Sequence, residues 1–319
     1  MKKLNRSELY NHCSTVNSAE LHNTYYPLDH FAVIEVAGDD AARFLQGQLT
    51  CNVTELNEIK GNIAAFCNPK GRVISTLLLI KQESSFIVIL PRSLVDTVAK
   101  KLRMYILRAK VVLTDRSEST QLLGLLCPEA SDRVPTASET FGVSHTPFVA
   151  IRLPSSTPRF LCLINDMSIT PQLDALRSAN FRERSADEWR WQDITTALPW
   201  FDAPRSEQFI PQMLNLDLLG GVSFNKGCYT GQEIVARTHF LGKSKRQLYL
   251  AECGDALEKS GKFSVLDAAT LEKQGEVLCW QSLGCQSRLL LVLQIVDEPV
   301  KPLILDDDKR TALALISCQ

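Results

Sequence analysis

Apolar positions along the chain predict groups of strands separated by single helices. The run 31–38 (FAVIEVAG) is apolar and ends at glycine, which is typical of a buried strand. Residues 61–67 and 72–80 read as two strands joined by the turn NPKG, because proline and glycine provide the backbone angles of a tight turn. Helical spacing over 91–109, with a proline at its start, predicts a helix. This mixture favours α+β layers over regularly alternating parallel units.

The pattern changes after about residue 245. Five short apolar segments follow one another with turn residues between them: RQLYLAEC, GKFSVLDA, GEVLCWQS, SRLLLVLQIV and TALALIS. None has helical spacing over a useful length. This part of the chain therefore predicts a small antiparallel barrel or sandwich.

Composition narrows the functional classes. The 35 Lys and Arg residues balance 36 Asp and Glu residues, so no overall field attracts nucleic acid or an anionic membrane. The most basic stretch, 100–110, is read as a solvated helix face, with an RNA or partner surface as the alternative. No signal-like or membrane-spanning apolar run is visible, so we expect a cytoplasmic protein that makes no membrane contact. Ten cysteines without a Cys-x-x-Cys pair indicate reduced thiols, and the scattered histidines predict no metal site.

One segment, FNKGCYTGQEIVAR at 224–237, combines a helix start with reactive side chains. Thr230 and Glu233 have the spacing of a capping box, and Glu233 and Arg237 are four residues apart on one helix face. This interpretation leaves Lys226 and Cys228 unexplained. A cysteine just before a helix, two residues from a lysine, is favoured as a thiolate, which can act as nucleophile, metal ligand or redox group. Packing alone is the competing interpretation of Cys228.

The extended motif FNKGCYTGQEIVARTHFLGKSKRQLY closely resembles the signature of the YgfZ family. These are folate-binding proteins related to the T-protein (aminomethyltransferase) of the glycine cleavage system and implicated in iron–sulfur cluster maintenance and tRNA modification. LDHFAVIEVAGDDAARFLQGQLTCNVTEL, CNPKGRVISTLLL and the segment from WRWQDITTALPW to the motif also look like the family in order and spacing. The resemblance covers roughly residues 25 to 250.

The resemblance implies a ring of three domains around a central channel that holds a folate, with the last domain an antiparallel β-barrel. We expect residues 1–240 to form a folate-binding region of two α+β lobes, roughly 20–112 and 113–240, which could intertwine. Residues 241–319 would form the barrel. The protein would bind tetrahydrofolate or a derivative and act as a monomer.

The same resemblance implies which side chains meet the folate. Two aromatic positions of the family fall on Phe31 and Trp189, and a relative has tryptophan where this chain has Phe31. Glu233 resembles a carboxylate close to the pterin, which can accept two hydrogen bonds from a ring amine and amide. Further folate contacts are expected from Arg237, Gln232 and Tyr229, and Arg237, Lys226 and Arg246 are candidates for the glutamate tail.

The hairpin departs from the T-protein enzymes. They carry an aspartate pair after the turn, the first member of which resembles a catalytic acid, whereas this chain has Ser75 and Thr76. A hydroxyl with its ordinary high pKa cannot replace an ionised carboxylate in proton transfer. The sequence therefore disfavours aminomethyl transfer.

Three functions remain as predictions. The first is a folate-dependent auxiliary factor for iron–sulfur proteins or their assembly factors, with an indirect link to tRNA modification. In it Cys228 is the essential thiol facing the folate channel, and Lys226 is its electrostatic neighbour. The second is a tetrahydrofolate-dependent aminomethyl or one-carbon transferase. The third is a tRNA- or protein-binding module that uses no ligand.

Overall fold

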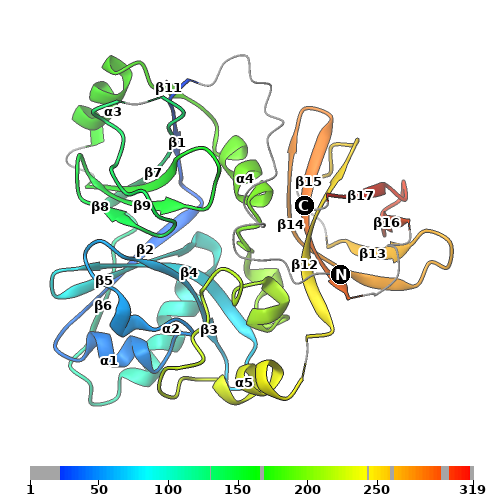
Figure 1. Cartoon of the computed structure of the whole chain (residues 1–319), viewed down its shortest axis with the longest axis horizontal. Coiled ribbons are helices and arrows are strands. Elements are labelled where there is room, and N and C mark those ends of the chain that lie inside the picture. The colour runs from blue at the N-terminus through cyan, green and yellow to red at the C-terminus, as the bar shows by residue number, and fades with distance from the viewer. Residues whose placement is uncertain are drawn as a thin grey trace.

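The computed structural model describes residues 22–129, 131–165, 169–242, 244–258, 262–295 and 302–316. The amino-terminal segment, to which the expectation about a secretion signal refers, lies outside these ranges. Two open sheets and a closed barrel make up the molecule, and each has helices or loops against it (Figure 1). The expected α+β class is confirmed.

The first sheet is antiparallel and has the strand order β3-β4-β5-β2-β6. Its strands are β2 (Phe31–Ala37), β3 (Asn62–Cys67), β4 (Val73–Gln82), β5 (Ser85–Pro91) and β6 (Val112–Asp115). The predicted strands and hairpin are thus confirmed. Continuous apolar runs mark β3 and β5 as strands buried on both faces, and all but the first residue of β3 are buried.

Helices α1 (Ala41–Gln46) and α2 (Val95–Ile106) belong to the first sheet, with the 3-10 turns η1 (Val53–Glu55) and η2 (Arg92–Leu94) beside them. The helix predicted over 91–109 is confirmed but shorter. It begins with the 3-10 turn η2 and ends before Leu107, whose φ of 45° breaks the helical path.

The second sheet has the order β11-β1-β7-β10-β9-β8. Its strands are β1 (Thr24–Pro27), β7 (Thr120–Leu126), β8 (Val143–Ser144), β9 (Val149–Leu153), β10 (Arg159–Asn165) and β11 (Arg182–Glu183). Strand β1 precedes β2 in the chain yet pairs with β7, so the chain passes through the second sheet before it builds the first. Helices α3 (Ile169–Ser178) and α4 (Ala186–Thr195) also belong to this part of the chain.

The carboxy-terminal strands form a closed antiparallel barrel in the order β12-β15-β14-β13-β16-β17. They are β12 (Arg246–Cys253), β13 (Ser264–Asp267), β14 (Lys273–Leu283), β15 (Gln286–Gln294), β16 (Leu303–Leu305) and β17 (Ala312–Ile316). Pairing of β12 with β17 completes the closure, so the predicted barrel is confirmed. Among the described residues, no helix is long and apolar enough to span a membrane.

Helix α4 joins the second sheet to the barrel (Figure 1). The guanidinium of Arg288 on β15 lies 4.7 Å from the ring centroid of Trp191 and donates to the Thr195 hydroxyl at 2.6 Å. After α4 the chain returns to the first sheet through η4 (Ala203–Arg205) and η5 (Pro211–Leu214), and it reaches the barrel through α5 (Gln232–Phe240). We call the first sheet with its helices the first unit and the second sheet with its helices the second unit. These two units and the barrel therefore meet in the middle of the molecule.

Candidate functional site

A cavity of about 850 Å³ lies where the three units meet. The first sheet, α4, the segment 198–205 and barrel strand β14 all contribute to its wall. Its aromatic lining includes Phe31, Trp200 and Trp280, and the rings of Phe31 and Trp200 meet edge to face with centroids 5.1 Å apart. Such a wall suits a flat aromatic ligand, because aromatic rings pack favourably in stacked and edge-to-face arrangements.

Unpaired polar atoms lie among these aromatic rings. Both ring nitrogens of His30 and the indole nitrogen of Trp200 are buried and have no hydrogen-bond partner within the described part of the chain. A buried polar group left unpaired costs about 1–3 kcal/mol. A heteroaromatic ligand with its own donors and acceptors fits these residues, because it could satisfy them after a small rearrangement.

His30 is uncharged at neutral pH. Burial, with a smaller contribution from the Arg190 charge, lowers its pKa to about 3. The side chain is 16% exposed. A neutral imidazole can offer one donor and one acceptor to a ligand.

The stability of the protein should fall in acid because of His30. As the pH drops from 6.5 to about 4.5, the unfolded chain binds a proton at this histidine, whereas the folded chain, with a pKa of about 3, does not. We expect this to remove about 2 kcal/mol of the free energy of unfolding. Urea unfolding at both pH values should show a correspondingly smaller loss in His30→Gln. An equal loss in both proteins would contradict the assignment.

Trp189, predicted to stack on folate, is fully buried. The Arg159 guanidinium lies 4.4 Å from its ring centroid and Tyr26 is 5.4 Å away between centroids. On another side, a Cβ added at Gly124 would come within 2.4 Å of the indole. With its surface covered by protein, Trp189 presents no face to a ligand in this structure, which corrects the sequence-based expectation.

Arg159, on β10, forms a buried ion pair with Asp193 on α4. Their side chains are 0% and 5% exposed, and Asp193 also borders the central cavity. Burial raises the pKa of Asp193 to about 6, and the nearby Arg159 charge opposes this shift. The pair is therefore ionised at neutral pH and links the second sheet to the cavity wall.

The loop that carries Cys228 is attached elsewhere, on the first unit. The Lys226 ammonium donates to the carbonyl oxygens of Leu49 and Cys51, both at 2.7 Å, and lies 5.1 Å from the Tyr229 ring centroid. Burial lowers the pKa of Lys226 to about 8. These contacts fix the loop to the segment after α1, and the predicted interaction of Lys226 with the Cys228 thiol is not among the described contacts of either residue.

Cys228 itself is exposed. A Cβ added at the neighbouring Gly227 would meet no atom within 4 Å, so the space beside Gly227 is open. Cys228 is not among the residues that line the central cavity. The structure thus shows an exposed thiol outside the lining of the central cavity, and its orientation toward a folate channel stays a prediction.

The start of α5 differs from the predicted capping box. Gly231, with φ of 84°, is the N-cap residue, and no side chain caps the helix. Thr230 donates instead to the Gln48 side chain at 3.2 Å. A Cβ at Gly231 would lie 2.5 Å from the Asn68 carbonyl oxygen, so close packing on the β3–β4 turn requires glycine here. Glu233 and Arg237 form no ion pair with each other within the described chain.

The remaining predicted folate contacts also lie away from the cavity. Gln232, Glu233 and Arg237 are on α5 at the outer side of the first unit (Figure 1), and none of them lines the central cavity. Tyr229 is buried, and burial raises the pKa of its hydroxyl above the ordinary value. Of the eight predicted site residues, the structure thus places only Phe31 on the cavity wall.

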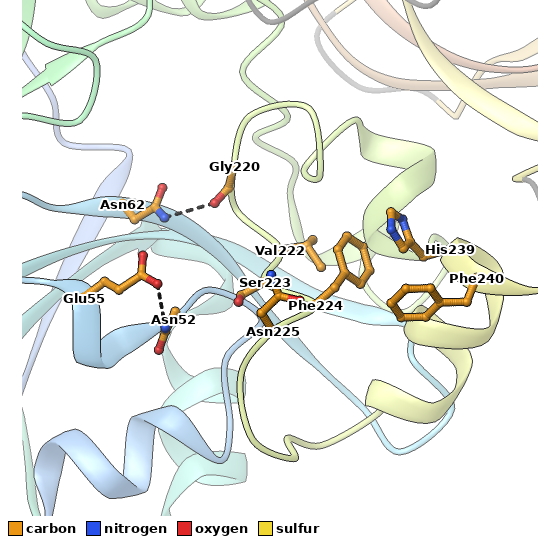
Figure 2. Close-up of a pocket in the computed structure, with 10 residues that line it drawn as sticks. All are labelled: Asn52, Glu55, Asn62, Gly220, Val222, Ser223, Phe224, Asn225, His239 and Phe240. Carbon is orange, nitrogen blue, oxygen red and sulfur yellow. Dashed lines mark hydrogen bonds between the residues drawn. The ribbon is translucent and has the colours of Figure 1, made fainter.

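A smaller pocket of about 370 Å³ adjoins the loop. Figure 2 shows Phe224, from the loop, beside His239 and Phe240 of α5, with Asn52 and Asn62 opposite. The Phe224 and His239 rings stack with centroids 3.6 Å apart, and Phe240 is 65% exposed. Cys228 does not line this pocket, so the thiol and the aromatic cluster are separate features.

Ser75 and Thr76, which stand where the T-protein enzymes carry their aspartate pair, are buried in the hairpin. Ser75 and Thr76 are both 0% exposed. The Ser75 hydroxyl donates to the Thr76 carbonyl at 2.7 Å, and the Thr76 hydroxyl donates to the Pro199 carbonyl at 2.9 Å. Both hydroxyls are thus engaged with backbone and do not face the cavity.

Sequence reasoning did not assign His30, Trp200 or the polar face of α4 to the site. A signal for the last was present, since Asp187, Arg190 and Ile194 are spaced for one helix face and all line the cavity. Trp189 lies on another face of the same helix. No comparable local pattern marks His30 or Trp200.

Comparisons with known proteins agree with this architecture. Residues 14–157 match the family described as GCVT N-terminal domain. A glycine cleavage system aminomethyltransferase T from Bartonella henselae superimposes with a TM-score of 0.72 at 13% identity, covering 93% of this chain and 85% of that one. The protein therefore has the aminomethyltransferase T fold.

Relatives in sequence define the family more narrowly. A tRNA-modifying protein YgfZ of Hamiltonella defensa is 34% identical over 265 residues, covering 78% of each chain. One of the same name from Cronobacter sakazakii is 35% identical over 254 residues, covering 77% of this chain and 76% of its own length. The chain belongs to the YgfZ family.

Proposed function

We propose that this protein is a tetrahydrofolate-binding auxiliary factor that supports iron–sulfur cluster assembly or repair in the cytoplasm, and thereby tRNA modification. The name of its relatives supports the link to tRNA modification. The observation that carries the proposal is the central cavity, in which aromatic rings and the unpaired nitrogens of His30 and Trp200 lie together. Tetrahydrofolate or a derivative would occupy it.

The folate ring would contact Phe31 and Trp200. Where a relative has tryptophan, this chain has Phe31. Trp200 stands edge-on against Phe31, and its indole nitrogen has no hydrogen-bond partner among the described residues. Trp200 can therefore supply the aromatic surface and the donor that phenylalanine lacks. Arg190 and Asp193 of the same wall are the candidates for the polar edge of the ligand.

Aminomethyl transfer is a weaker candidate. Its acid would have to stand at the hairpin, where this chain has two buried hydroxyls bonded to backbone carbonyls. A serine or threonine hydroxyl with its ordinary pKa does not supply the charge or the proton transfer of a carboxylate.

Cys228 would act as the essential thiol at the outer surface of the first unit. Its exposure makes it accessible to an iron–sulfur protein or an assembly factor, while the folate would lie in the central cavity. Lys226 would hold the loop in place through its two carbonyl bonds. The ligand and the thiol would thus be linked through the first unit, without direct contact between them.

Titration calorimetry with tetrahydrofolate tests the ligand. We expect heat from the wild-type protein and binding at least about tenfold weaker for Trp200→Ala, a difference of about 1.4 kcal/mol, because the variant loses an aromatic wall. Phe240→Ala, which alters an exposed aromatic ring in the other pocket, should bind like the wild type. If folate produced neither heat nor a thermal shift, the ligand-free binding module would be the better description.

A further inference from the structure

The pocket of about 370 Å³ beside α5 combines aromatic rings with polar side chains (Figure 2). The rings are those of Phe224, His239 and Phe240. The polar side chains that line the same space are Asn52, Glu55, Asn62, Ser223 and Asn225. This combination differs from an apolar groove, and its volume is at the lower end of the range for small-ligand sites.

The aromatic cluster has an uncovered ring. Phe224 and His239 stack on each other with an interplanar angle of 13°. The Phe240 ring stands at 86° to His239, with centroids 4.8 Å apart, and the residue is 65% exposed. A fixed aromatic ring that is open to solvent beside a pocket is a stacking platform for a flat heterocycle.

Several polar groups of the pocket have unused hydrogen-bonding capacity. Within the described chain, neither the Asn225 amide nor the Ser223 hydroxyl forms a hydrogen bond, and the same is true of the His239 ring nitrogens. The Asn62 amide uses one of its hydrogens on the Gly220 carbonyl, at 3.0 Å. A side-chain amide offers both donors and an acceptor, so the pocket presents both kinds of group beside the aromatic rings.

The charges around the pocket separate a ligand ring from its phosphates. Glu55 is the one charged side chain among the described residues that line it, and its carboxylate accepts from Asn52 at 2.7 Å. This carboxylate disfavours a phosphate inside the pocket. Arg237 is exposed, precedes Phe240 by three residues on α5 and forms no ion pair within the described chain. An uncharged ring can therefore enter while a phosphate stays outside, on the side of Arg237.

We propose that this pocket binds an unpaired adenine base, presented by a free nucleoside or by single-stranded RNA. Unpaired bases are recognised by stacking on aromatic rings and by hydrogen bonds to their edges. Adenine is favoured because a side-chain amide such as that of Asn225 matches its amine and adjacent ring nitrogen. An apolar side chain of a protein partner fits less well, since it would leave the amides unpaired. The pocket shares no lining residue with the central cavity, so this site is independent of the proposed folate.

The test uses uridine octamers of RNA with one central adenine or guanine, and fluorescence anisotropy with the full chain. The wild type should bind the adenine octamer about tenfold more tightly than the guanine octamer. Phe240→Ala should weaken binding of the adenine octamer about tenfold, because it removes the stacking platform. Tyr105→Ala is the matched control, since it removes a 38% exposed aromatic ring that does not line the pocket, and it should bind like the wild type.

Asn225→Asp gives a readout that a purely structural role would not produce. A carboxylate only accepts hydrogen bonds, so it loses the donor that meets a ring nitrogen of adenine and matches the two adjacent donors on the edge of guanine. The preference should therefore reverse, and the guanine octamer should bind more tightly than the adenine octamer. A loss of affinity that is equal for both octamers would contradict the assigned contact.

Nucleosides without phosphate distinguish the two sources of the base. Saturation-transfer NMR should show contact of the protein with adenosine, and less with guanosine. If the base comes from RNA, the octamer should bind more tightly than adenosine, and Arg237→Gln should reduce the salt dependence of octamer binding by about one phosphate contact while leaving adenosine binding unchanged. If it comes from a nucleoside, the octamer should have no advantage and Arg237→Gln no effect.

Three results would overturn the adenine site. They are the absence of binding by both adenosine and the adenine octamer, equal affinity of the wild type for the two octamers, and unchanged binding of the adenine octamer by Phe240→Ala. The thermal midpoint of each variant shows that it is folded. None of these results would affect the calorimetric test of tetrahydrofolate in the central cavity.

Discussion

Replacing Asp193 by alanine should lower the free energy of unfolding by about 3–5 kcal/mol. Arg159 is fully buried, Asp193 is its ion-pair partner, and two further guanidinium nitrogens of Arg159 have no hydrogen bond within the described chain. Removal of the carboxylate would leave a positive charge inside the second unit, beside Trp189. An unpaired buried charge is among the most destabilising changes in a protein interior.

Urea unfolding measures this effect, and two variants make it specific. Arg159→Met/Asp193→Leu removes both charges and should be much closer to the wild type than Asp193→Ala. Lys110→Ala breaks an ion pair to Asp39 whose side chains are 77% and 79% exposed, and it should change stability little. A loss below about 1 kcal/mol for Asp193→Ala would contradict the assigned role of the pair.

Apolar runs and turn residues in the sequence predicted most of the strands and helices, because such local patterns reflect which side chains are buried. The runs at β2, β3 and β4 are mostly apolar and mostly buried, and the turn between β3 and β4 has the residues that its angles require. The order of strands was not predictable in this way. Pairing of β1 with β7 joins segments about a hundred residues apart, and local spacing carries no record of such contacts.

The site was harder to predict, because residue type does not give the direction of a side chain. Trp189 and Trp200 are both tryptophans near the cavity, yet one is enclosed by Arg159 and Tyr26 and the other stands on the wall. The capping-box pattern at Thr230 is likewise overruled by a long-range contact, the packing of Gly231 on the β3–β4 turn. A long-range contact also determines where the motif 224–237 lies relative to the central cavity. Lys226 attaches the loop to Leu49 and Cys51, which precede it by more than a hundred positions.

Replacing Cys228 by serine should abolish the ability of the protein to restore iron–sulfur enzymes. The thiolate is the form of cysteine that attacks electrophiles and binds metals, and a serine hydroxyl does not ionise near neutral pH. Because the side chain is exposed and the space beside Gly227 is open, the substitution should leave folding unchanged. Cys285→Ser is the matched control, since Cys228 and Cys285 are the two exposed cysteines among the described residues.

The most direct measurement is the anaerobic activity of iron–sulfur enzymes in a strain that lacks this protein and is supplied with wild type, Cys228→Ser or Cys285→Ser at equal abundance. The wild type and Cys285→Ser are predicted to restore the activities, and Cys228→Ser is predicted to leave them at the level of the deletion strain. Full restoration by Cys228→Ser would contradict the central claim that this exposed thiol is essential to the function of the protein.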